Sequence, residues 1–189
     1  MLLVNEPGEE CTVSNGVLRL SATPTPIQYA GFMVLPLGTN SQVRDLYASV
    51  DILDWVTSSS NWVYFALGGR GVYHPQTDSA NGYIGGLVMN GDSIPGNVKL
   101  SVWDGSADVR GPNFDTAVHP PPYRLEFSVV GNNLRLRVLN LATRALIAEQ
   151  PLVRASFTQG WVGCWINRRN SAGDSFTITL DNFFMSGTK

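Results

Sequence analysis

Charged side chains are scarce in this chain of 189 residues, and neither sign dominates. Asp, Glu, Lys and Arg make up 15% of the sequence, whereas globular proteins average about 25%. The 13 Lys and Arg against 15 Asp and Glu give a net charge of −2. Phosphate-backbone binding needs a clustered basic surface, so the composition argues against a nucleic-acid partner. The sequence also lacks a run of about 18 apolar residues, so no membrane-spanning helix is predicted.

Cysteine is also rare, since the sequence has only Cys11 and Cys164. Two cysteines allow one intrachain disulfide, and the alternative is that both are small buried hydrophobic side chains. Cys164 alternates with Val162 and Ile166, which favours the alternative. The start of the chain has neither the basic nor the hydrophobic segment of a signal peptide. Localisation therefore stays open, and it is extracellular if the chain is a domain of a longer secreted protein.

Helical periodicity is missing as well, and period-two alternation takes its place. Hydrophobic residues make up 43% of the chain, and 19 Gly and 11 Pro help to separate the apolar runs. Many short strands between turns are typical of two packed antiparallel sheets. We predict an all-β fold, a two-sheet antiparallel β-sandwich, in one domain spanning residues 1–189. The expected strands are 16–21, 30–35, 46–55, 61–67, 83–89, 97–103, 122–130, 133–140, 145–149, 161–167 and 175–185.

One hairpin can be placed in register, because two alternating runs flank Gly131-Asn132. Such a dipeptide suits a two-residue turn with positive φ. The resulting register pairs Val129 with Leu134, Phe127 with Leu136, Leu125 with Val138 and Glu126 with Arg137. A loop centred on Asn132-Asn133 would shift the pairing by two residues and lose the contact between Glu126 and Arg137.

Three segments near the end of the chain carry a resemblance to a known family. They are Tyr123-Arg-Leu-Glu-Phe with Gly131-Asn-Asn-Leu134, Gly160-Trp-Val-Gly163, and Ile178-Thr-Leu-Asp-Asn-Phe-Phe184. Together they resemble the closing strands of the concanavalin A-like lectin/glucanase superfamily, including its laminin G-like domains. The resemblance implies a jelly roll with one concave and one convex sheet, whose last strand pairs near the first. Because this superfamily contains hydrolases, lectins, carbohydrate-binding modules and protein-binding domains, the fold alone does not decide the activity.

The carboxylates do not match the catalytic pattern of the superfamily's glucanases. Those enzymes carry Glu-x-Asp-x-x-Glu on one strand, which places alternate carboxylates in one cleft. None of the five Glu of this chain falls in that pattern, and Glu9 and Glu10 lie in a polar stretch expected to be solvated. An enzyme is therefore the less favoured alternative, as a glycoside hydrolase or lyase with an unrecognised site on Asp51, Asp104 or Glu126.

Other patterns that could carry chemistry are weak. His74 and His119 each precede a proline and, with the two cysteines, offer no recognised zinc spacing. Gly68-Gly-Arg-Gly71 lacks the Lys-Ser/Thr of a phosphate-binding loop, so a turn is expected there. Asp104 and Asp108 flank Gly105, where Asp favours the turn itself.

Strand parity places several aromatic side chains on the face opposite the core. The predicted outward set is Trp62, Tyr64, Trp103, Trp161 and Trp165. Sugar rings stack on such side chains while polar neighbours fix their orientation. The predicted polar partners are Asp104, Arg70, Asn167 and Arg168. The alternatives are that loops at 71–82 or 104–121 cover this face as a second small core, or that it contacts another protein.

The resemblance also implies a structural calcium ion. In many relatives an Asp of the last strand holds calcium on the convex side together with backbone carbonyls near the N-terminus. Asp181 matches that Asp, and oxygen ligands suit calcium. The alternative is that Asp181 marks a bulge or caps a turn.

The sequence favours a non-catalytic carbohydrate-binding or recognition domain with a glycan as its partner. The glycan is expected to stack on Trp62, Tyr64, Trp103 and Trp165 and to be oriented by Asp104, Arg70 and Asn167. Besides the hydrolase, a structural or adhesion domain of a larger surface or viral protein is a third hypothesis, in which the aromatic face is a packing surface.

Overall fold

The computed structural model consists of strands and turns, with no α-helix in the part of the chain that it describes. It describes residues 2–4, 9–22, 29–35, 43–57, 62–74, 79–91, 94–160, 162–169 and 175–188, and only the backbone at 2–4, 9–11, 22, 29–35, 71–74, 79–81, 162 and 165–169. The predicted all-β sandwich is confirmed. No helix of the described residues is long and apolar enough to cross a membrane.

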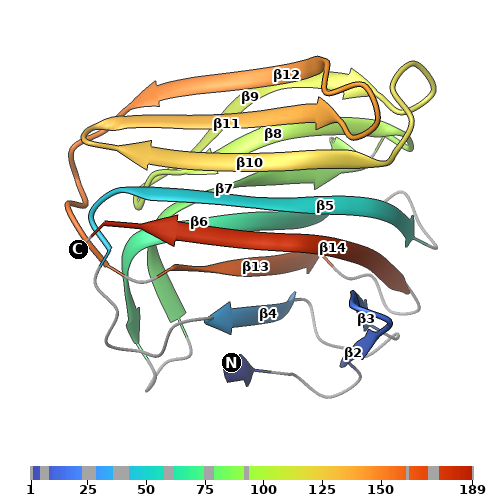
Figure 1. Ribbon diagram of the computed structural model, residues 1–189, viewed down its shortest axis with the longest axis horizontal. Helices are drawn as coiled ribbons and strands as arrows, with labels where there is room; N and C mark the ends of the chain where they lie inside the picture. The colour runs from blue at the N-terminus through green and yellow to red at the C-terminus, as the bar shows by residue number, and fades with distance from the viewer. Residues whose placement is uncertain are drawn as a thin grey trace.

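The strands described form two seven-stranded sheets, called sheet A and sheet B. Sheet A has the order β1 (Leu2–Val4), β4 (Tyr29–Leu35), β13 (Val162–Arg169), β6 (Val63–His74), β7 (Ser79–Met89), β8 (Asn97–Trp103) and β9 (Asp108–Asp115). Sheet B has the order β12 (Leu146–Val153), β11 (Asn133–Asn140), β10 (Tyr123–Val130), β5 (Leu46–Thr57), β14 (Phe176–Gly187), β3 (Val17–Ala22) and β2 (Glu9–Ser14). Figure 1 shows the two sheets as layers of a sandwich, with β14 between β5 and β3.

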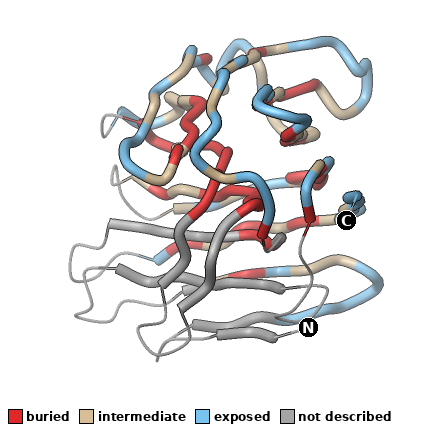
Figure 2. The backbone as a smooth tube through the Cα atoms, turned by 90° about the vertical axis from the view of Figure 1, so that its left-hand side faces the viewer, coloured by how far each residue is buried: buried red, intermediate tan, exposed pale blue. Residues whose placement is uncertain are grey.

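The hydrophobic core lies between the sheets and uses alternate residues of each strand. On β10, Leu125, Phe127 and Val129 are fully buried, while the residues between them are partly exposed. Gly85 on β7 faces this layer, because a Cβ there would lie 2.5 Å from the ring of Phe127. Figure 2 shows the buried positions gathered in the interior of the molecule and the exposed ones towards its periphery. The alternation of apolar and polar residues in the sequence therefore gives each sheet a buried inner face and an outer face.

The hairpin between β10 and β11 has the register that turns at Gly131-Asn132. Glu126 is paired with Arg137, and their side chains form an ion pair with 3.2 Å between Oε2 and Nη1. Gly131 has a φ of 55°, which a residue without Cβ adopts at no steric cost. This pairing is confirmed, and the alternative shifted by two residues is not adopted.

Three of the strands in the described residues, β1, β2 and β9, are not shown by the alternation. The sequence predicts a loop at 104–121, but Asp108–Asp115 within it form β9 at the edge of sheet A, with a register irregularity opposite Lys99 and Ser101. Gly111 and Pro112 hide the period-two pattern, and proline is tolerated there because an edge strand leaves some N–H groups unpaired. The polar stretch containing Glu9 and Glu10 is predicted as a solvated segment, but its backbone forms β2, paired with β3.

The glycine-rich segment 68–71 does not form a turn. It lies inside β6, where the pairing with β7 shifts between Gly69 and Val72. Arg70, within this bulge, has a φ of 53°. A bulge re-aims side chains relative to the regular alternation, so the parity of β6 does not predict the direction of Arg70.

Cys164 lies in the core, where its side chain is 2% exposed. The predicted burial of this side chain is confirmed. The side chain of Cys11 falls outside the described residues, so the pairing of the two cysteines stays a prediction.

Candidate functional site

The outer face of sheet A brings together the central residues of β6, β7, β8 and β9. Directly paired residues of antiparallel strands share a face. One row therefore runs from Gly68 through Ile84 and Trp103 to Asp108. The next runs from Ala66 through Gly86 and Ser101 to Arg110, and a third from Tyr64 through Val88 and Lys99 to Asn113. We call these residues the outer face.

Buried side chains form the floor of the outer face. Ala66 is 0% exposed, Ser101 is 1% exposed and Ile84 is 6% exposed, although all three point away from the core. Gly86 lies between Ala66 and Ser101 in the same row. Larger neighbours therefore cover this floor, and the exposed part of the face belongs to them.

Tyr64 is one of these covering side chains. Its hydroxyl lies 3.0 Å from the carbonyl oxygen of Ile84 and 3.3 Å from that of Ser101, so the side chain crosses β7 and reaches β8. Burial raises the pKa of the hydroxyl well above its ordinary value, and the nearby Asp108 carboxylate raises it further. The hydroxyl therefore stays protonated and donates to these backbone carbonyls. The half-buried ring is the part of Tyr64 that a ligand can contact.

The register places one indole with Tyr64 at this face. Trp103 stands opposite Ile84 on one side and Asp108 on the other, and it is half-buried. Trp62, also half-buried, immediately precedes β6, and its position on the outer face stays a prediction from the strand alternation. Partly exposed rings over a buried floor offer apolar contact area to a ligand.

Asp108 supplies the carboxylate of the outer face. The Ser101 hydroxyl donates to its Oδ1, and Arg110 Nε lies 3.8 Å from its Oδ2. The side chain of Asp108 is 45% exposed. The sequence pattern around Gly105 predicts a turn role for Asp108. Asp108 instead begins β9, and the signal that could have found it is the alternation of Lys99, Ser101 and Trp103 on the neighbouring strand β8.

Trp165 and Asn167 are placed by their backbone alone. The register of β13 sets Trp165 opposite Ala66 and Asn167 opposite Tyr64, at the border of the outer face. Their side chains, with that of Arg168 and with Trp161 as a whole, fall outside the described residues.

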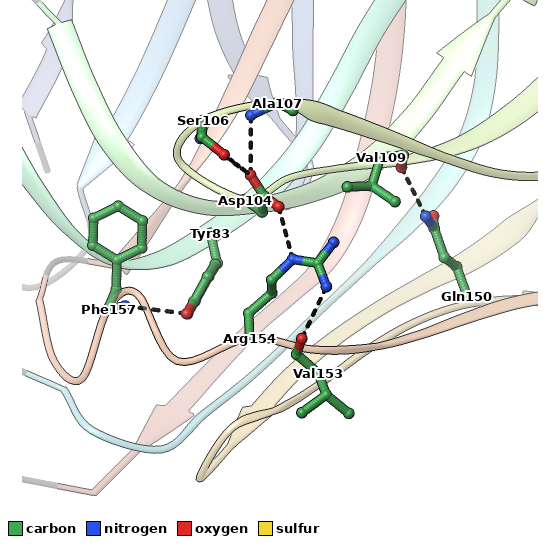
Figure 3. A network of polar contacts seen from close by, with 9 residues as sticks. All are labelled: Tyr83, Asp104, Ser106, Ala107, Val109, Gln150, Val153, Arg154 and Phe157. Atoms are coloured by element: carbon green, nitrogen blue, oxygen red, sulfur yellow. Dashed lines mark hydrogen bonds and ion pairs between the residues drawn. The ribbon is translucent and has the colours of Figure 1, made fainter.

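Asp104 is not brought to the outer face (Figure 3). Its Oδ1 accepts hydrogen bonds from the backbone N–H groups of Ser106 and Ala107 and from the Ser106 hydroxyl. Its Oδ2 accepts from Nε of Arg154 at 2.7 Å, which joins the end of β8 to the segment that follows β12. Asp104 is 8% exposed, so its oxygens are used within the protein. The predicted turn role fits this geometry, and the ligand-orienting role is not supported by it.

The Asp104 network predicts a pH-dependent contribution to stability. The hydrogen bond from Arg154 lowers the pKa of the Asp104 carboxyl below its ordinary value. A lowered folded-state pKa stabilises the fold above the unfolded-state value, near 4, and this contribution is lost as the pH falls below it. We expect Asp104→Asn to cost about 2 kcal/mol at pH 6 and less at pH 3. Urea unfolding at both pH values measures the gap, and a gap independent of pH would contradict the assignment.

Arg70 is likewise directed away from the outer face. Its Nε donates to the carbonyl of Arg44 and its Nη1 to the carbonyl of Gly131. Its Nη2 lies 2.8 Å from Oδ1 of Asp45 and 3.5 Å from the Val129 carbonyl. The guanidinium is 3% exposed and ties β6 to the strand ends of sheet B. It is not placed to orient a ligand over Trp103.

The acids of the hydrolase alternative do not form one open pair. Asp51 is 1% exposed and accepts from Nε and Nη2 of Arg124 and from Nδ2 of Asn182. Glu126 also lies on the outer side of sheet B and accepts from Arg137 and Tyr47. Asp104 belongs to the separate network with Arg154. Two reachable carboxyl groups about 5 to 9.5 Å apart are needed for glycoside hydrolysis, and the buried Asp51 cannot supply one.

The described surroundings of Asp181 do not confirm the calcium ion, which stays a prediction. Asp181 is opposite Asp51 in the register, and its Oδ1 accepts from the backbone N–H of Asn182 at 2.7 Å. The carboxylate opposite it is thus one already neutralised by Arg124. No cluster of three His, Cys, Asp or Glu that could hold a metal occurs within the described ranges. A register shift follows Asp181, where Asn182 has a φ of 48°, so the bulge predicted as the alternative is present.

No family model matches this chain, and no curated protein matches it in sequence. Solved structures match its fold. A functionally unknown protein from Saccharomyces cerevisiae has a TM-score of 0.63 and 9% identity, covering 100% of this chain and 96% of that one. The Ca²⁺/Man3GlcNAc-bound exoplasmic/lumenal domain of VIP36 has a TM-score of 0.57 and 10% identity, covering 100% and 84%. A Bacillus licheniformis β-glucanase has a TM-score of 0.55 and 11% identity, covering 95% and 82%.

At such identities the likeness establishes the fold and leaves the ligand open. The laminin G-like part of the resemblance stays a prediction. The structural matches include both lectin-like and glucanase folds, in agreement with the resemblance carried by the closing strands. The chain has the concanavalin A-like jelly-roll fold.

Proposed function

We propose that this protein is a non-catalytic carbohydrate-binding domain whose ligand lies on the outer face of sheet A. The observation that carries the proposal is the position of Trp103 and Tyr64 on one face, with the Asp108 carboxylate opposite Trp103. Trp62 is included on the strand alternation alone. Half-exposed rings beside an oriented acceptor match what a sugar offers, an apolar C–H face and a rim of hydroxyl groups.

The proposal revises the polar partners expected from the sequence. Asp108 takes the place of Asp104 and Arg70, whose side chains bond within the fold. Trp165 and Asn167 remain in the proposed site on the basis of their register with Ala66 and Tyr64. Asp108 is the one carboxylate among the residues that define the outer face, so the face offers a binding arrangement rather than an acid pair.

A glycan array tests this proposal with the wild type and Trp103→Ala. Removing the indole is expected to weaken binding at least about tenfold, a loss of roughly 1.4 kcal/mol. Phe184→Ala is the matched control, because Phe184 is 53% exposed on sheet B, away from the proposed site. Thermal unfolding of each variant verifies that it is folded.

Running the array with calcium and again with EDTA separates sugar binding from any dependence on the metal. Loss of binding in Trp103→Ala but not in Phe184→Ala supports the proposal. A wild type that binds nothing, or binding that survives Trp103→Ala, contradicts it and favours a structural or protein-contact role for the outer face.

A further inference from the structure

The environment of Asp108 carries information about which glycans suit the proposed site. Asp108 stands opposite Trp103 in the register, so the two side chains share a face and are neighbours. The Ser101 hydroxyl that donates to Oδ1 is part of the buried floor, because Ser101 is 1% exposed. A donor on a rigid strand fixes the carboxylate in one orientation.

The other oxygen of this carboxylate is held less firmly. Arg110 Nε lies 3.8 Å from Oδ2, which is longer than a hydrogen bond. The side chains of Arg110 and Asp108 are 64% and 45% exposed, and an ion pair so exposed to water is weak. Oδ2 is therefore the acceptor that a ligand hydroxyl can approach beside the indole.

We propose that Asp108 is a specificity-determining residue, whose Oδ2 accepts a hydrogen bond from a hydroxyl of the sugar stacked on Trp103, and that the site selects neutral over acidic glycans. This inference rests on the proposed function. An ionised carboxylate only accepts hydrogen bonds. A sugar hydroxyl satisfies it, whereas a uronate carboxylate or a sulfate at the same place brings a second acceptor of the same charge.

The positive charges of the outer face do not reverse this preference. Lys99 is four residues from Trp103 along β8, about 13 Å at the usual rise of a strand. Arg110 is close to Trp103 but lies beside Asp108, so that the local charge is that of an ion pair. The residue directly opposite Trp103 is the one that bears the carboxylate.

The test compares wild type, Asp108→Asn and Asp54→Asn on an array of neutral glycans and glycans bearing uronate or sulfate. Asp54→Asn makes the same charge change at an exposed site on sheet B. The wild type is expected to bind neutral glycans. Asp108→Asn is expected to bind neutral glycans about tenfold more weakly, in line with the loss of a hydrogen bond to a charged group. The ratio of its affinity for neutral glycans to its affinity for acidic glycans is expected to be smaller than in the wild type. Asp54→Asn is expected to bind like the wild type.

A second variant, Ser101→Ala, removes the hydroxyl that orients the carboxylate and is expected to weaken neutral binding in the same direction by a smaller factor. The inference is overturned if Asp108→Asn binds neutral glycans within about twofold of the wild type, or if the wild type prefers acidic glycans, while Trp103→Ala still loses binding. That result leaves the proposed function standing. If the wild type binds no glycan, or Trp103→Ala binds normally, the proposed function fails and this inference with it.

Discussion

Arg70→Met is expected to lower the free energy of unfolding by about 3 kcal/mol. The guanidinium is 3% exposed and donates to the carbonyls of Arg44 and Gly131 and to the Asp45 carboxylate. Methionine fills similar space but removes the donors to the two carbonyls and leaves Asp45 Oδ1 with the Gly131 N–H, and a hydrogen bond that involves a charged group contributes about 1.5 to 3 kcal/mol. Arginine and methionine at position 70 carry the same cost of a positive φ, so the substitution changes only the side-chain contacts.

Urea unfolding followed by fluorescence measures the effect. Arg19→Met is the matched control, because Arg19 is exposed on β3, and it is expected to change the free energy of unfolding by less than about 0.5 kcal/mol. Arg70→Lys keeps the charge but lacks the forked donors, so it is expected to recover only part of the loss. An Arg70→Met variant as stable as the control would show that the contact between β6 and the strand ends of sheet B contributes little.

Gly86→Ala is expected to destabilise the fold by about 3 kcal/mol or to prevent folding. A Cβ at Gly86 would lie 2.5 Å from Cα and from Cβ of Ala66, and closer still to the carbonyl oxygen of Phe65. The obstacle is the backbone of β6, so a side-chain rotation cannot remove the clash. The two strands would have to separate under the side chain of Tyr64, which crosses them.

The control for this variant is Gly91→Ala, where the nearest atom to an added Cβ is Cβ of Lys99 at 3.2 Å. A small adjustment relieves that contact, and the expected cost is below about 1 kcal/mol. Thermal and urea unfolding of both variants give the comparison. Equal stabilities would contradict the close approach of β6 and β7 at the floor of the outer face.

Much of the fold could be predicted from the sequence, because the alternation of apolar and polar residues along a strand shows which of its faces is buried. The register between β10 and β11 is correct since a Gly at the turn fixes where the chain reverses, and the burial of Phe127 and Leu136 fixes which face is inside. The edge strand β9 escapes prediction because an edge accepts Gly111 and Pro112, which a central strand would exclude.

The candidate site could be predicted only in part. Parity places Tyr64 and Trp103 on the outer face, because both lie in regular strand segments. The same rule fails for Arg70, because the bulge inside β6 turns its side chain inward. The sequence Gly-Gly-Arg-Gly does not reveal in which direction that side chain points. Asp104 and Asp108 have similar sequence surroundings, and only the partner Arg154, 50 residues away, separates the structural acid from the exposed one.

Titration of the glycan that binds best on the array, by isothermal calorimetry against wild type, Trp103→Ala and Phe184→Ala, tests the central claim most directly. If the outer face of sheet A is the binding site, Trp103→Ala binds at least about tenfold more weakly than the wild type and Phe184→Ala binds equally well. If Trp103→Ala keeps the wild-type affinity, or Phe184→Ala alone loses it, the ligand does not lie on the outer face and the aromatic side chains of sheet A have another role.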